Sequence, residues 1–126
     1  LGASGSIREK IEAAWAGITI HENTIAERLL EYLRSRDDCR IIGRERGDDP
    51  QRVPTISFVV EGRDSGKIAR QMDPYNIAIR FGDFHARRLA EYLDLAGSNG
   101  CVRVSMAHYN TLEEVDALVG ALDEIL

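Results

Sequence analysis

Two arginines lie where they could hold a negatively charged group. Arg103 falls inside the run from Cys101 to Met106, Arg80 ends the run from Ile77 to Arg80, and apolar residues alternate with both. Because the side chains of a strand alternate between its two faces, we predict that both arginines point away from the core. A guanidinium on a rigid strand can bind a carboxylate through two parallel hydrogen bonds. The plain alternative is a structural arginine on a solvated face.

An acid and two histidines could add polar chemistry. Asp83 and His85 lie in the segment after Arg80, and His108 follows the last predicted strand. The loop pair could act as an acid, a base or a polar contact, although a solvated histidine is the simplest interpretation. We predict no metal site, because one would need three or four ligands with supporting partners.

No residue of the chain is predicted to be catalytic. Lys10 and Lys67 are the only lysines among sixteen basic residues, and both fall on exposed faces of predicted helices. A lysine that bonds to a carbonyl group is usually desolvated, which neither position suggests. Cys39 and Cys101 lack the C-x-x-C spacing of a metal or redox pair, so we interpret them as small apolar side chains.

The end of the chain is predicted to form a strand, a turn and a helix. Thr111 and Glu114 have the spacing of a capping box, so the helix should begin at Leu112. Its apolar residues recur every three or four positions and form one stripe that must lie on a sheet: Leu112, Val115, Leu118, Val119, Leu122, Ile125 and Leu126.

The first 36 residues are predicted to be helical. Ser6 and Glu9 form one capping box, Thr19 and Glu22 form a second, and Gly17 ends the first helix between them. The two helices could instead be one long, bent element.

The middle of the chain alternates strands with short helices. We predict strands at 41–42, 53–60 and 77–80, one helix after Asp64 and another at 86–93. The order indicates an α+β fold, with a small, mainly antiparallel sheet covered on one face by helices. Residues 1–126 would form a single domain, with 1–36 as a helical lead-in and 37–126 as an α+β sandwich.

The composition argues against several classes of partner. Sixteen basic and twenty-one acidic residues give a net charge of -5, so we expect no nucleic-acid partner. No apolar run approaches the roughly 18 residues of a membrane span, so we expect no membrane partner. The widely separated cysteines fit reduced thiols in a cytoplasmic protein.

Three ordered motifs carry a resemblance to a known family. The run from Arg103 to Asp116 reads R-x-S-x-x-x-Y-N-T-x-x-E-V-D, and the run at 52–58 reads R-x-P-T-x-S-F. Arg80, Gly82, Ala86 and Leu89 have the spacing of R-x-G-x-x-C-A-x-x-L. The chain thereby resembles cysteine desulfurases and related class V aminotransferases, which use pyridoxal phosphate. The resemblance covers 51–126 well and the helix around His21 more loosely.

The resemblance implies that this chain is the C-terminal small domain of a fold-type I pyridoxal-phosphate enzyme, and so a fragment of a longer protein. The lysine, aspartate and phosphate site that hold the cofactor belong, in that family, to a preceding large domain. We therefore expect no bound cofactor and no activity in this chain alone. The implied partners are that large domain, a small amino-acid substrate and, in a homodimer, a second copy of the longer protein. Arg103 matches the arginine that holds the substrate α-carboxylate, and Arg80 the arginine beside a mobile loop.

The sequence departs from the family at His85, which occupies the position of the cysteine that forms a persulfide. An imidazole cannot accept sulfane sulfur as a thiolate does, so the resemblance is to desulfurase-like members without that cysteine. Asp83 and His85 would then contact the substrate from the loop. One alternative is a stand-alone α+β module that binds a small carboxylate on the same two arginines, and another is a purely structural interaction domain.

Overall fold

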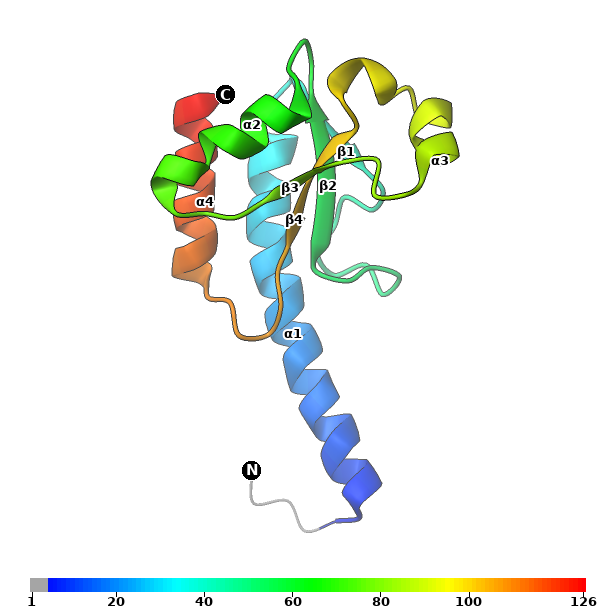
Figure 1. Ribbon diagram of the computed structural model, residues 1–126. Coiled ribbons are helices and arrows are strands. Elements are labelled where there is room, and N and C mark those ends of the chain that lie inside the picture. Colours follow the sequence, from blue (N-terminus) through cyan, green and yellow to red (C-terminus); the bar gives the residue numbers. More distant parts are fainter. Residues whose placement is uncertain (1–4) are drawn as a thin grey trace.

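The computed structural model describes residues 5–126, so the first four residues of the predicted lead-in lie outside the described residues. Figure 1 shows the helices and strands in chain order, with two short 3-10 turns at Asp73–Tyr75 and Ala96–Ser98. Their bounds are α1 (Ile7–Arg34), β1 (Cys39–Ile42), β2 (Thr55–Val60), α2 (Ser65–Gln71), β3 (Arg80–Gly82), α3 (Arg87–Tyr92), β4 (Cys101–Ser105) and α4 (Leu112–Ile125).

The strands form one antiparallel sheet in the order β1-β2-β4-β3. The central strand β4 pairs Val102 with Phe58 of β2 on one side and with Phe81 of β3 on the other. The neighbouring residue, Arg103, lies between Ser57 and Arg80. Because directly opposed residues of antiparallel strands share a face, these three side chains lie together on one face of the sheet, opposite the face that carries Val102.

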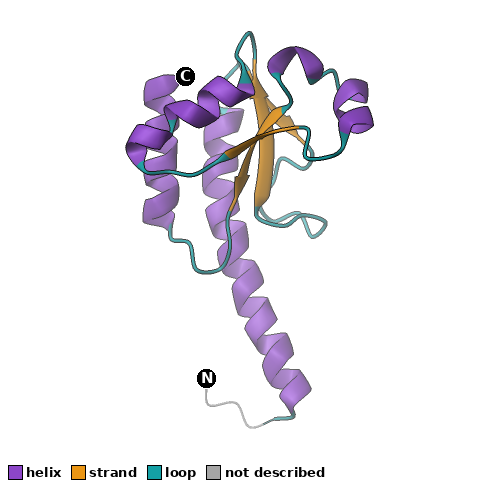
Figure 2. Ribbon diagram, in the orientation of Figure 1, coloured by secondary structure: helices purple, strands orange, loops and turns teal. Residues whose placement is uncertain are grey.

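Helices α1, α2 and α4 cover the first face of the sheet (Figure 2). The alternating apolar residues of β2 and β4 pack there against the apolar stripes of the helices, as the period-2 and period-3.6 patterns require. The predicted α+β class, an antiparallel sheet covered on one face by helices, is confirmed. The largest fully buried side chains are Ile25, Leu29, Leu30, Leu33, Ile56, Phe58, Ile68, Met72, Val102 and Leu122.

The second face of the sheet carries a smaller apolar cluster. It is formed by Val59 and Cys101 from the strands and by Ala90 and Leu95 from the α3 segment. Phe84 packs against this cluster from the loop before α3 and is itself partly buried. The second face is therefore anchored at one end by a short helical segment, while Arg80 lies exposed and Arg103 partly buried.

Helix α1 is continuous, so the prediction that Gly17 ends a first helix is wrong. The Ser6–Glu9 capping box starts the helix as predicted, but Thr19 and Glu22 lie inside it. A single exposed glycine costs a helix only about 1 kcal/mol relative to alanine, which is too little to interrupt favourable turns on both sides. The resulting 28-residue helix is the longest element described.

The first half of α1 projects from the rest of the molecule (Figure 1). Ile7 is 78% exposed, Ile11 52% and Trp15 62%, and their spacing places them along one side of the helix. The second half packs into the core through Ile25 and Leu29. No helix formed by residues 5–126 is both long and apolar enough to cross a membrane.

Strand β3 is shifted from its predicted place at 77–80. Ile77 and Ile79 do pack against the core, as their alternation predicts, but only residues 80–82 pair with β4. An apolar period-2 pattern reports burial and not ladder hydrogen bonds, which explains the wrong bounds. Arg80 therefore begins the strand and does not end it.

Helix α4 begins as predicted. The Thr111 hydroxyl accepts a hydrogen bond from the Glu114 backbone N–H at 3.3 Å, and the Glu114 carboxylate accepts one from the Thr111 N–H at 3.0 Å. The turn before α4 is joined to α1, because His21 Nε2 lies 2.7 Å from the Asn110 carbonyl oxygen. This contact fixes the segment that leads out of β4 against the long helix.

Candidate functional site

The candidate site is built around Arg80 and Arg103, which lie opposite each other on β3 and β4. In the described residues 5–126, neither guanidinium forms an ion pair with a carboxylate. Like charges at directly opposed positions destabilise a sheet, typically by up to about 1 kcal/mol. Two neighbouring arginines without carboxylate partners in the described residues therefore lower the stability of the fold. They are also suited to bind an anionic ligand.

Arg103 also has an unsatisfied polar atom. Its Nε is buried, and within residues 5–126 it has no hydrogen-bond partner. A buried donor without an acceptor costs roughly 1–3 kcal/mol, so most are paired in native proteins. Residues 5–126 therefore supply no acceptor for this N–H group.

Phe84 covers the Arg103 guanidinium. The Arg103 Cζ atom lies 3.9 Å from the centroid of the Phe84 ring, which is a close cation–π contact. The backbone places the ring there through an unusual turn, with φ of 51° at Phe84 and 65° at His85. Two consecutive non-glycine residues in the left-handed region cost roughly 1–2 kcal/mol each.

Asp83 stabilises this turn. One of its carboxylate oxygens accepts a hydrogen bond from the His85 backbone N–H at 3.1 Å, and its carbonyl accepts one from the Ala86 N–H at 2.8 Å. The His85 residue is exposed at the rim of the site. The loop therefore presents the imidazole to solvent beside the arginine pair.

Glycines at two positions fix the path of the loop. Gly82 has φ of 124° and Gly100 has φ of 78°, both in the region that favours glycine. A Cβ atom on Gly100 would lie only 2.3 Å from the Gly82 carbonyl carbon, so the two backbones meet without room for a side chain. The buried Ser65 hydroxyl donates a hydrogen bond of 3.2 Å to the Gly100 carbonyl. This close approach holds β3 against the beginning of β4.

The arginine pair opens into a hollow of about 580 Å³, within the range of small-ligand sites. Arg70 from α2 lines it too and lies over the Phe81 ring, with its Cζ 5.7 Å from the ring centroid. The predicted site residues Arg80, Asp83, His85 and Arg103 all line this hollow. His108 is not among its lining residues and instead packs edge-on against Tyr109.

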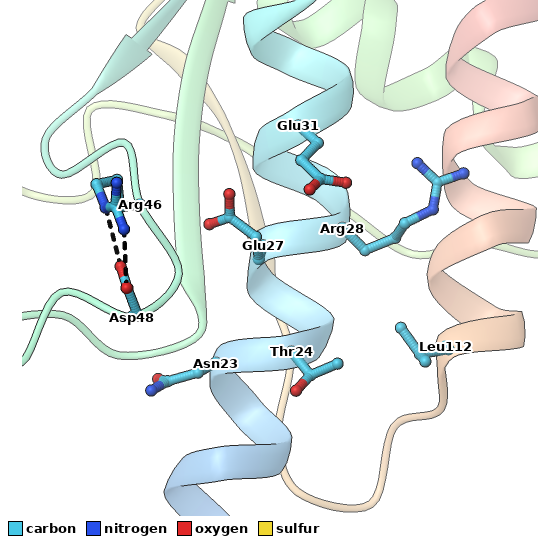
Figure 3. A pocket seen from close by; sticks show the side chains of 8 residues that line it. All are labelled: Asn23, Thr24, Glu27, Arg28, Glu31, Arg46, Asp48 and Leu112. Carbon is cyan, nitrogen blue, oxygen red and sulfur yellow. Dashed lines mark hydrogen bonds and ion pairs between the residues drawn. The ribbon is translucent and has the colours of Figure 1, made fainter.

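Another hollow lies between α1, the β1–β2 loop and the start of α4, and most of the charged residues that line it are already paired (Figure 3). Arg46 contacts Asp48 at 2.9 Å, and Arg28 contacts Asp116 at 2.6 Å. Glu27 accepts hydrogen bonds from the Gly47 backbone and from Arg34, and so holds the β1–β2 loop on α1. These contacts hold the β1–β2 loop in place, so we interpret this hollow as a feature of loop packing and not as a ligand site.

The thiols and lysines of the chain do not fit a covalent role. Burial raises the pKa of both the Cys39 and the Cys101 thiol, which disfavours the reactive thiolate. Lys10 and Lys67 are exposed, and neither lines the hollow. A pyridoxal phosphate held through a lysine therefore does not fit residues 5–126, whereas a carboxylate fits the arginines.

Sequence reasoning missed Phe84 and Arg70 as residues of the site. Phe84 lies in a short loop without periodicity, and no glycine signals its left-handed backbone. Arg70 reaches the hollow from α2, and only the packing of α2 beside β3 brings it there.

A family model for aminotransferase class-V matches residues 6–118, and the chain belongs to this family. It is 39% identical over 119 residues to the aminotransferase-like protein FGM3 of Gibberella zeae, covering 94% of this chain and 30% of the relative. It is 41% identical over 115 residues to the cysteine desulfurase-like protein ustD of Aspergillus flavus, covering 89% of this chain and 26% of the relative. The chain thus spans less than a third of the length of these relatives.

Solved structures agree with this family. The apo cysteine desulfurase of Thermococcus onnurineus NA1 has a TM-score of 0.77 and 28% identity, with 94% of this chain and 28% of that chain covered. The cysteine desulfurase CsdA of Escherichia coli has a TM-score of 0.68 and 30% identity, with 82% of this chain and 24% of that chain covered. The chain is thus similar to one part of these enzymes.

Proposed function

We propose that this chain is the C-terminal, substrate-closing domain of a desulfurase-like enzyme that uses pyridoxal phosphate and acts on an amino acid. Arg103 binds the α-carboxylate of the substrate, Arg80 is the supporting cation, and Asp83 and His85 contact the substrate from the loop. The observation that carries the proposal is the pair of arginines opposed in register on β3 and β4, for which residues 5–126 provide no carboxylate partner.

The geometry of the arginines supports this role. A carboxylate between the two side chains would offset their mutual repulsion and supply acceptors for unpaired N–H groups. A strand holds such donors more rigidly than a loop does, which favours one orientation of the bound group. The binding free energy thereby positions the substrate for a reaction that takes place on other groups.

The chemistry itself would come from outside this chain. Pyridoxal phosphate, when bound, supplies the electron sink. The relatives of this chain are longer proteins, so we expect the residues that hold the cofactor to lie outside this chain. We infer that the chain alone is inactive, and that the large cofactor-binding domain packs on the exposed apolar side of α1. A homodimer of the complete protein and a cytoplasmic location remain parts of the proposal.

Transfer of sulfur through a loop cysteine is not part of the proposal. His85 occupies that position, and Cys101 is buried on β4 with its Sγ 3.7 Å from the Gly82 carbonyl oxygen. Without an accessible thiolate in the loop, the enzyme has no acceptor for sulfane sulfur at this place.

The test replaces Arg103 in the complete product of the gene that encodes this chain. Binding of L-alanine, as a probe, is followed by the absorbance of the cofactor. We expect Arg103→Ala to weaken binding roughly 10-fold to 100-fold, the range for charge-assisted hydrogen bonds, while the cofactor stays bound. The control is Arg40→Ala on the same face of the sheet, where the guanidinium already donates to the Leu93 carbonyl at 3.0 Å.

Unchanged binding by Arg103→Ala would remove its assigned role. The alternative, a stand-alone carboxylate-binding module, is tested on this chain alone with amino acids and keto acids. Saturable binding that disappears with Arg103→Ala would favour that module over the domain of an enzyme.

A further inference from the structure

We propose that Phe84 is the positioning residue of Arg103, holding its guanidinium in the orientation that accepts a carboxylate. The inference rests on the proposed function, because it assigns the carboxylate to Arg103. It adds a residue to the site and explains the left-handed backbone at Phe84 and His85.

The contact leaves Arg103 able to bind an anion. A Cζ atom 3.9 Å from the ring centroid lies over the face of the Phe84 ring and not at its edge. The N–H donors of a guanidinium point outward in its own plane, so a ring over its face does not compete for them. The same side chain can therefore stack on Phe84 and bind a carboxylate at its edge.

Phe84 is itself held by a second contact. It packs against the cluster of Val59, Ala90, Leu95 and Cys101, so the residue contacts both this cluster and Arg103. Its left-handed backbone is supported by the Asp83 carboxylate, which accepts the His85 N–H. A strained turn of this kind persists only where its surroundings determine it, and here they place one aromatic ring on one cation.

Arg103 needs such support, because the chain gives it little else. Within residues 5–126 its buried Nε has no acceptor, no carboxylate pairs with it, and the neighbouring Arg80 repels it. A long side chain without partners samples many rotamers, and ordering it on binding would lower the affinity. Contact with Phe84 restricts this freedom before the ligand arrives.

The test uses the complete gene product with pyridoxal phosphate and L-alanine as the probe, read by cofactor absorbance. Phe84→Leu keeps an apolar side chain on the cluster but removes the ring, whereas Phe84→Tyr keeps the ring. We expect Phe84→Leu to raise the apparent dissociation constant about threefold to tenfold, with a melting temperature within about 4 °C of the wild type. Phe84→Tyr should bind as the wild type does, because it keeps the ring. If Phe84 had a purely structural role, binding would not depend on the ring and Phe84→Leu would also bind as the wild type does.

The outcomes separate this inference from the proposed function. Wild-type affinity in Phe84→Leu, together with lost binding in Arg103→Ala, overturns the positioning role and leaves the carboxylate site intact. Unchanged binding in Arg103→Ala, or no binding of L-alanine by the wild type, overturns the proposed function and this inference with it. Phe84→Met is the second variant without a ring, and if both Phe84→Leu and Phe84→Met fail to fold, Phe84 is a structural residue.

Discussion

Arg80 and Arg103 are opposed partners in the β3–β4 ladder, so two like charges lie side by side on one face of the sheet. Binding of an anion at this place would relieve a repulsion that the free chain retains. The stability of the fold and the affinity of the site are therefore opposed at these positions.

We expect Arg80→Gln to stabilise the chain, by about 0.5 kcal/mol or less because the position is exposed, and to weaken the binding of L-alanine by the complete protein. Urea denaturation of both forms measures the first effect. Arg40→Gln is the matched control, because Arg40 lies on the same face but donates to the Leu93 carbonyl. A loss of stability in Arg80→Gln as large as that in Arg40→Gln would contradict the repulsion.

The outer position of the arginines was predictable, but the contacts around them were not. Alternation of Val102 and Val104 with Arg103 is a local property of the sequence, and it was sufficient to assign the two faces of β4. The Phe84 contact depends on a left-handed backbone at two non-glycine residues. The residue types at these positions do not predict that conformation. The bounds of β3 depend on which backbone groups pair with β4, and burial patterns do not report that pairing.

Gly100 and Gly120 are expected to respond in opposite directions to alanine. Gly100→Ala should destabilise the chain by about 2 kcal/mol or more, because φ is 78° and the new Cβ would meet the Gly82 backbone. Gly120→Ala should stabilise it by about 0.5–1 kcal/mol, because this exposed helical glycine has nothing within 4 Å of the added Cβ. Thermal denaturation of the two variants measures the difference, and equal effects would contradict the close approach of β3 and β4.

Stability should depend on pH through the capping box of α4. Hydrogen bonds from the Asn110 side chain and the Thr111 backbone hold the pKa of Glu114 below the ordinary glutamate value. A carboxyl whose pKa is lower in the folded state stabilises the protein above the unfolded pKa, and this contribution is lost as the pH falls through the folded pKa. We expect the difference in unfolding free energy between the wild type and Glu114→Gln to shrink from about pH 5 to about pH 3. A difference that stays constant over this range would contradict the lowered pKa.

The exposed apolar side of α1 gives the last prediction. Ile7, Ile11 and Trp15 are exposed on one side of the projecting half of the helix, which has no contact with the core cluster of the described residues. Burial of such side chains contributes about 1.5–3 kcal/mol each, so a domain packed here in the complete protein would depend on them. Ile11→Glu should change the stability of this chain alone by less than about 0.5 kcal/mol but destabilise the complete protein by about 1–3 kcal/mol. Ala13→Glu is the control, because two residues further on the helix has turned by about 200°. Equal effects of the two variants in the complete protein would mean that the apolar side of α1 is not where another domain packs.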